Sequence, residues 1–112
     1  MKRNKILDEA QRSIERQQYD RAIRAYRSLL LESPSDLKTR LKLAELYLRT
    51  RDLSAAIKHY HLIADYYVSS GDQERATSVY ELVVKISADD IKSRSFLLDR
   101  VIREGIQSET TK

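Results

Sequence analysis

The sequence predicts an all-α fold in which about six antiparallel helices stack as about three helical hairpins. The chain has 112 residues but only two glycines and one proline. That is too little turn chemistry for an all-β fold, in which each hairpin needs its own turn residues. Apolar residues recur at helical spacing in six segments, and one pattern returns after 34 residues, as it does in stacked repeats.

The six segments are separated by short runs of residues that stop and start helices. They are expected over residues 4–16, 19–31, 37–49, 53–68, 73–86 and 91–104. Pro34 ends the second, because proline disfavours helical backbone in the residue before it. Either Ser35 or Asp36 is suited to accept from the free N–H groups of the third helix.

Aspartates recur at the starts of the later helices. Asp52, Asp72 and Asp90 are each placed to cap the helix that follows. Gly71 is expected to stop the fourth helix, and Gly105 the last one. We therefore expect residues 105–112 to form a flexible C-terminal tail.

The fourth helix, LSAAIKHYHLIADYYV, carries apolar residues over an unusually wide part of its circumference. A helix this apolar is normally covered from more than one side. It is expected to lie at the centre of the stack.

An internal repeat is the strongest signal in the chain. Residues 19–29 realign on residues 53–63 at an offset of 34, which matches Ala22 to Ala56 and Tyr26 to Tyr60. A third copy of the alanine–aromatic pair follows the second after only 20 residues, and residues 90–103 realign on residues 36–49. Together these patterns resemble the tetratricopeptide repeat family, which implies an α-solenoid of helical hairpins.

The resemblance covers most of the chain and sets the expected domain organisation. A single repeat domain is expected over residues 1–104. Its repeats are expected at about 3–36, 37–70 and an overlapping 57–90, with a closing helix at 91–104. Alanines at the repeat positions would let helices approach closely, while tyrosines fill the space between hairpins. Tyr19 and Tyr66 are expected on the surface, and the other five tyrosines in the core.

The composition restricts the environment and the partners. The chain has no cysteine, which excludes disulfides and thiolate metal sites, and no window is long enough to span a bilayer. No signal-peptide core follows the basic N-terminus, so a cytoplasmic location is expected, without membrane insertion. Residues 1–56 hold 13 lysines and arginines against 8 acidic residues, a balance of +5, whereas residues 57–112 have a balance of −1, so the basic charge of the chain lies in its first half.

Catalysis is not expected, because no reactive constellation is present. His59 and His61 are two residues apart and point in different directions on a helix, so they cannot share a metal ion. Asp89 and Asp90 lie at a helix start, where capping is the ordinary role. The glycines are too few and too far apart for a phosphate-binding loop. No cofactor and no metal ion are expected.

The family resemblance implies that the first helix of each hairpin lines a concave groove that binds a partner protein. The groove positions are Asn4, Leu7, Gln11, Glu15, Lys38, Leu41, Lys42, Glu45, Leu48 and Arg49. Their mixture of aliphatic and cationic side chains suits an acidic or amphipathic peptide or helix. The protein is thus expected to be a non-catalytic adaptor. Two alternatives stay open: nucleic-acid or ribosome association through the basic half, and self-association as a homodimer.

Overall fold

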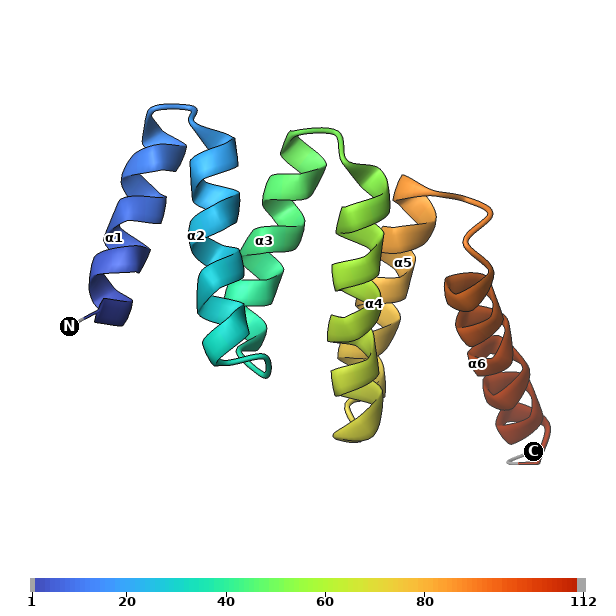
Figure 1. Ribbon diagram of the computed structural model, residues 1–112. Coiled ribbons are helices and arrows are strands. Elements are labelled where there is room, and N and C mark those ends of the chain that lie inside the picture. Colours follow the sequence, from blue (N-terminus) through green and yellow to red (C-terminus); the bar gives the residue numbers. More distant parts are fainter. Residues whose placement is uncertain (1, 111–112) are drawn as a thin grey trace. The chain divides into compact units, whose positions relative to one another are not determined.

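A computed structural model describes the backbone of residues 2–110 and the side chains of residues 2–106 (Figure 1). Over these residues the chain forms six helices and no strand, which confirms the all-α prediction. The helices are α1 (Lys2–Glu15), α2 (Tyr19–Glu32), α3 (Leu37–Arg49), α4 (Leu53–Ser69), α5 (Gln73–Ile86) and α6 (Ile91–Thr110).

Five of the six helices end within about two residues of their expected ends, but α6 does not. It continues through Gly105 to Thr110, so the expectation that Gly105 ends this helix was wrong. A glycine inside a helix costs only about 1 kcal/mol relative to alanine, and no proline follows to enforce a stop. Residues 111–112 of the expected tail lie outside the described residues, and flexibility of the tail stays a prediction.

The turns between helices repeat the same backbone conformation at the expected offsets. Gln17, Arg51 and Gly71 have positive φ angles of 60°, 67° and 79°, and they are 34 and 20 residues apart. Each turn also has a hydrogen bond back to the preceding helix, such as Gln18 N to Ser13 O at 2.7 Å. A left-handed residue with this bond is the usual way in which a helix stops. The internal repeat therefore appears in the backbone as well as in the side chains.

Four aspartates cap helices as expected. Asp36 accepts from Thr39 N at 3.1 Å, Asp52 from Ala55 N at 3.2 Å, Asp72 from Arg75 N at 3.1 Å and Asp90 from Ser93 N at 3.0 Å. Helix α2 differs, because its N-cap residue Gln18 makes no side-chain hydrogen bond to the helix.

The chain divides into two compact units, Met1–His59 and Tyr60–Lys112. The core of the first unit lies between α1, α2 and α3. It consists of Ala10, Ala22, Ile23, Tyr26, Leu29, Leu30, Leu43 and Leu46, all of which are buried. At the edge of this unit the guanidinium of Arg3 pairs with the Asp36 carboxylate, which joins the start of α1 to the cap of α3.

The second unit is built around Ala64, Ala76 and Tyr80, with Phe96 and Leu97 of α6 packed against them. The rings of Tyr80 and Phe96 lie 4.5 Å apart. Burial raises the pKa of the Tyr80 hydroxyl, and the negative charge of the Asp65 carboxylate, which accepts a hydrogen bond from this hydroxyl, raises it further. The contact between the Tyr80 and Phe96 rings holds the first half of α6 against α5.

The tyrosines largely follow the expected division between core and surface. Tyr26, Tyr60 and Tyr80 are buried, Tyr47 and Tyr67 are half-buried, and Tyr66 is exposed. Tyr19 was expected on the surface but is half-buried, because it packs against the core of the first unit.

Candidate functional site

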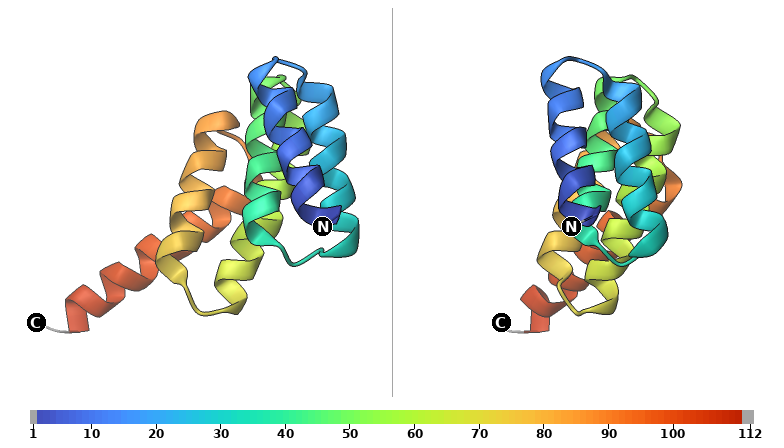
Figure 2. Two further views of the ribbon diagram at one scale, coloured as in Figure 1. Left: turned by 90° about the vertical axis from the view of Figure 1, so that its left-hand side faces the viewer. Right: turned by 60° about the vertical axis from the view of Figure 1, so that its left-hand side comes forward.

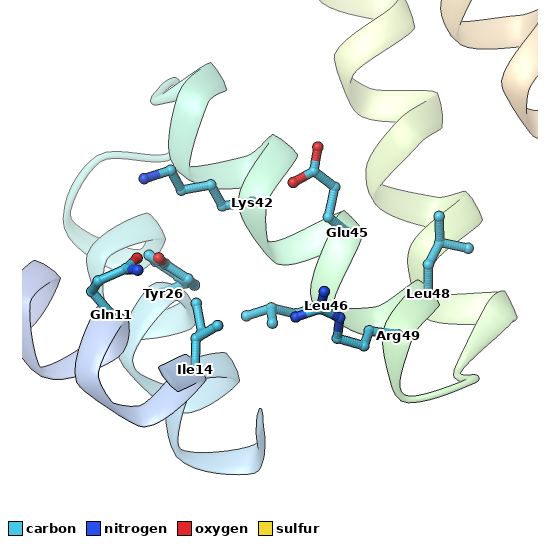
Figure 3. A pocket seen from close by; sticks show the side chains of 8 residues that line it. All are labelled: Gln11, Ile14, Tyr26, Lys42, Glu45, Leu46, Leu48 and Arg49. Carbon is cyan, nitrogen blue, oxygen red and sulfur yellow. The ribbon is translucent and has the colours of Figure 1, made fainter. Parts of the chain in front are cut away.

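A hollow of about 620 Å³ opens between α1, α2 and α3 of the first unit (Figure 3). It is lined by Gln11, Ile14, Tyr26, Lys42, Glu45, Leu46, Leu48 and Arg49. The side chains of Lys42 and Leu46 reach from α3 toward those of Gln11 and Ile14 on α1. We call this hollow the α1–α3 groove.

The α1–α3 groove combines an apolar floor with a charged rim. Leu46 is buried, and Ile14 and Leu48 are half-buried, so three aliphatic side chains are available to an apolar ligand group. Burial raises the pKa of the Tyr26 hydroxyl, and the nearby Glu45 carboxylate raises it further. Tyr26 therefore keeps its proton at neutral pH and is able to donate a hydrogen bond at the base of the groove.

The two cations of the rim have different surroundings. Arg49 places its guanidinium carbon 5.4 Å from the ring centre of Tyr19, a cation–π contact that holds the head group in place. Lys42 is half-buried and has no ion-pair partner within the part of the chain that the structure describes. An ammonium group on a partly apolar wall favours a negatively charged ligand.

Five of the ten residues that were expected in a partner-binding groove lie around this hollow. Gln11, Lys42, Glu45, Leu48 and Arg49 line the hollow. The other five do not line it, namely Asn4, Leu7, Glu15, Lys38 and Leu41. Leu7 packs against the core, and the remaining four are exposed elsewhere on α1 and α3.

Three lining residues were not expected in the groove. Tyr26 was expected in the core, and neither Ile14 nor Leu46 was among the expected groove residues. Ile14 is three residues after Gln11, and Leu46 is four residues after Lys42, so each shares a helix face with an expected groove residue. This spacing was the signal that could have identified them.

The two histidines of α4 face different neighbours, as their spacing predicts. Nδ1 of His59 lies 3.0 Å from the Arg40 guanidinium, and the His59 imidazole stacks on the ring of Tyr47. Nε2 of His61 lies 2.8 Å from the Asp90 carboxylate. Over the described residues no group of three or more potential ligands is placed to hold a metal ion, and no helix is long and apolar enough to cross a membrane.

Comparison with known proteins matches most of the chain to one kind of repeat. Two models described as "Tetratricopeptide repeat" match residues 13–68 and 57–90. No curated protein sequence matches. A solved structure titled "Crystal structure of MamA protein" is 18% identical, with a TM-score of 0.42 over 97% of this chain and 86% of that one. This structural likeness supports no further conclusion.

Proposed function

Because this chain belongs to the tetratricopeptide repeat family, we propose that it is a non-catalytic adaptor whose α1–α3 groove binds a segment of a partner protein. Tetratricopeptide repeats are generally protein–protein interaction modules and are typically non-catalytic. The groove volume of about 620 Å³ lies within the usual range for ligand pockets. It suits a few side chains of a peptide or one face of a helix.

The chemistry of the groove favours an acidic, amphipathic segment. Aliphatic side chains of the segment would pack on Ile14, Leu46 and Leu48, and its carboxylates would face Lys42 and Arg49. The observation that carries this proposal is Lys42, a half-buried cation without an ion-pair partner in the described chain. A carboxylate interacts more strongly with this ammonium group than with that of a fully hydrated lysine, because the effective dielectric constant is lower at a partly buried site.

The proposal is tested with two synthetic amphipathic helical peptides that share the same apolar face. One carries glutamates on its polar face, and the other carries lysines. We expect calorimetric titration to detect binding of the acidic peptide and not of the basic one. In two-dimensional NMR spectra the acidic peptide should shift the amide resonances of Gln11, Lys42 and Leu46.

A double variant and a matched control locate the binding surface. Lys42→Glu with Arg49→Glu should weaken binding of the acidic peptide about tenfold or more, since truncating or reversing charges at a binding site typically costs 1–3 kcal/mol. Arg24→Glu with Arg27→Glu changes the charge equally on the exposed side of α2, away from the groove, and should leave the affinity within about twofold. Equal loss in both double variants would refute a specific groove.

A second candidate function, nucleic-acid association, is favoured by a small basic cavity on the α1–α2 hairpin. The cavity has a volume of about 200 Å³, and Arg12, Arg16 and Arg21 line it together with a single acidic residue, Glu9. Binding of a generic single-stranded RNA, weakening steeply between low and moderate salt, would support it. In that case Arg12→Glu with Arg16→Glu should abolish RNA binding, while the groove double variant should reduce it less.

A further inference from the structure

The outer side of α6 in the second unit carries an uncovered apolar strip. The strip consists of Ile91, Leu98, Val101, Ile102 and Ile106, whose exposed fractions are 80%, 62%, 64%, 50% and 57%. Their spacing of seven, three, one and four residues keeps them on one side of a helix. Contiguous exposed aliphatic side chains on a single helix mark an interaction surface more often than isolated ones do.

The opposite side of α6 is already occupied by its own unit. Phe96 and Leu97 pack against the core of the second unit. The Arg100 guanidinium donates to Gln73 O at 2.8 Å and to Thr77 Oγ1 at 2.6 Å, which holds α6 against the start of α5. Helix α6 is therefore apolar on two sides, and only one of them is covered by the described chain.

The internal repeat shows what covers the equivalent face of another helix. Residues 90–103 realign on residues 36–49, so that Leu98 corresponds to Ala44 and Val101 to Tyr47. In the first unit Ala44 is fully buried, and Tyr47 stacks on His59 of α4 with ring centres 5.6 Å apart. The part of this α3 face around Tyr47 is thus covered by a helix, whereas Leu48, the counterpart of Ile102, lines the α1–α3 groove. A helix is therefore a fitting occupant for the strip on α6.

The position of α6 leaves room for that helix. Its C-terminal half projects past α5 (Figure 2), and every residue from 101 to 106 is exposed.

We propose that α6 pairs with α6 of a second copy of this chain in an antiparallel, twofold-symmetric contact. The five side chains of the strip leave about 500 Å² of apolar surface exposed, which is at the upper end for a monomer. With the twofold axis beside Val101, the side chains from Leu98 to Ile106 of the two copies face each other, and Ile91 lies outside the overlap. Together they would bury about 700 Å² of apolar surface, to which the polar flanks add, so the contact belongs with the small, weak interfaces. The same strip on both copies gives the self-complementary surface that a twofold contact requires.

The charges beside the strip agree with the antiparallel arrangement. Asp99 and Arg103 lie two residues before and two residues after Val101, on the same edge of the strip. A twofold axis beside Val101 therefore brings Asp99 of one copy opposite Arg103 of the second copy. The same axis places Leu98 between the Ile102 and Ile106 positions of the second copy, as interdigitating helices require. Within one chain Asp99 and Arg103 pair at 3.1 Å and are both exposed, so they are free to exchange partners.

The mass of the full chain in solution tests the pairing directly. An interface of this size is typical of weak association, and the measurement is designed around a dissociation constant on the order of 10 µM. Sedimentation equilibrium over increasing protein concentration should show the mass rising from that of one chain toward twice that value. A mass that stays at one chain up to about 500 µM overturns the proposal, since about fiftyfold excess over this constant leaves little monomer.

Glutamate substitutions at exposed apolar positions locate the contact. Ile102→Glu places a carboxylate in the centre of the strip and should keep the chain monomeric, with its helical content unchanged by circular dichroism. Leu31→Glu is the matched control, because Leu31 is 83% exposed on α2; its association should equal that of the unmodified chain. Association that survives Ile102→Glu overturns the proposal.

Charge variants test the antiparallel register and cannot be mimicked by a folding defect. Asp99→Arg alone and Arg103→Asp alone each place like charges opposite each other in a twofold pair and should weaken association. Mixed in equal amounts, the two variants face each other with opposite charges and should associate more strongly than either alone. A mixture no stronger than its components contradicts this pairing. The groove variant Lys42→Glu with Arg49→Glu should leave the mass unchanged, so the two proposals fail independently.

Discussion

The missing cap of α2 offers the sharpest test of how local sequence sets stability in this protein. Gln18 has φ −93° and ψ 67° and makes no side-chain hydrogen bond to the helix. Asp72, at the corresponding position of α5, has φ −92° and ψ 78°, and its carboxylate accepts from Arg75 N at 3.1 Å. The two backbones are nearly the same, so the variant Gln18→Asp should form the missing hydrogen bond without backbone movement.

The expected gain follows from the parts of the interaction. Replacing a non-capping residue by aspartate contributes about 1 kcal/mol, and a negative charge at a helix N-terminus is part of that gain. Asp72 also pairs with Arg75 at 3.0 Å, and Arg21 stands at the same distance in sequence from Gln18. That pair adds at most a few tenths of a kcal/mol, because the Arg21 side chain is 56% exposed and already lies 3.6 Å from Glu9.

Thermal and urea denaturation, followed by circular dichroism, measure the effect. A gain of about 1 kcal/mol should raise the melting temperature by about 4 °C for a chain of this length. Gln18→Glu is the control, because it carries the same charge on a side chain that is too long to cap. The gain of the aspartate variant should disappear as the pH falls through the pKa of its carboxylate, which capping lowers relative to the unfolded chain. If the aspartate variant is no more stable than the glutamate variant at neutral pH, the assignment of α2 as uncapped is refuted.

Two further predictions concern the left-handed residues of two turns and a half-buried histidine. Arg51→Gly should stabilise the chain by about 0.5 kcal/mol, because relief of the left-handed backbone strain slightly exceeds the added entropy of the unfolded state. Gly71→Ala should destabilise it by about 1 kcal/mol, because alanine is strained at this positive φ. Urea denaturation that gives the opposite sign for either variant would contradict the backbone assignment. Burial lowers the pKa of His59, and the charges of Arg40, Lys58 and Arg27 lower it further. Because the His59 imidazole therefore binds a proton more readily in the unfolded chain than in the folded one, the free energy of unfolding should fall as the pH drops below about 6.5. His59→Gln should flatten that part of the stability–pH curve, and an unchanged curve would exclude His59 as its cause.

The candidate groove was only partly predictable from the sequence. Lys42, Glu45 and Arg49 were identified because the repeat pattern assigns the inner face of α3. Tyr26 was missed because its place on an apolar stripe indicates burial but does not show that the buried side chain lies beneath an open hollow. Whether a residue on an apolar stripe lines a closed core or an open groove depends on how closely the neighbouring helix approaches. A local sequence pattern does not specify that distance.

The sequence by itself determined the helices, their aspartate caps and the spacing of the left-handed turn residues, because these depend on contacts within a few residues along the chain. Tertiary structure decided which apolar surfaces are covered. It placed Tyr19 beneath Arg49 and left the outer strip of α6 bare. Burial depends on residues that are distant in sequence and close in space. An apolar stripe therefore has the same sequence pattern whether or not a neighbouring helix covers it.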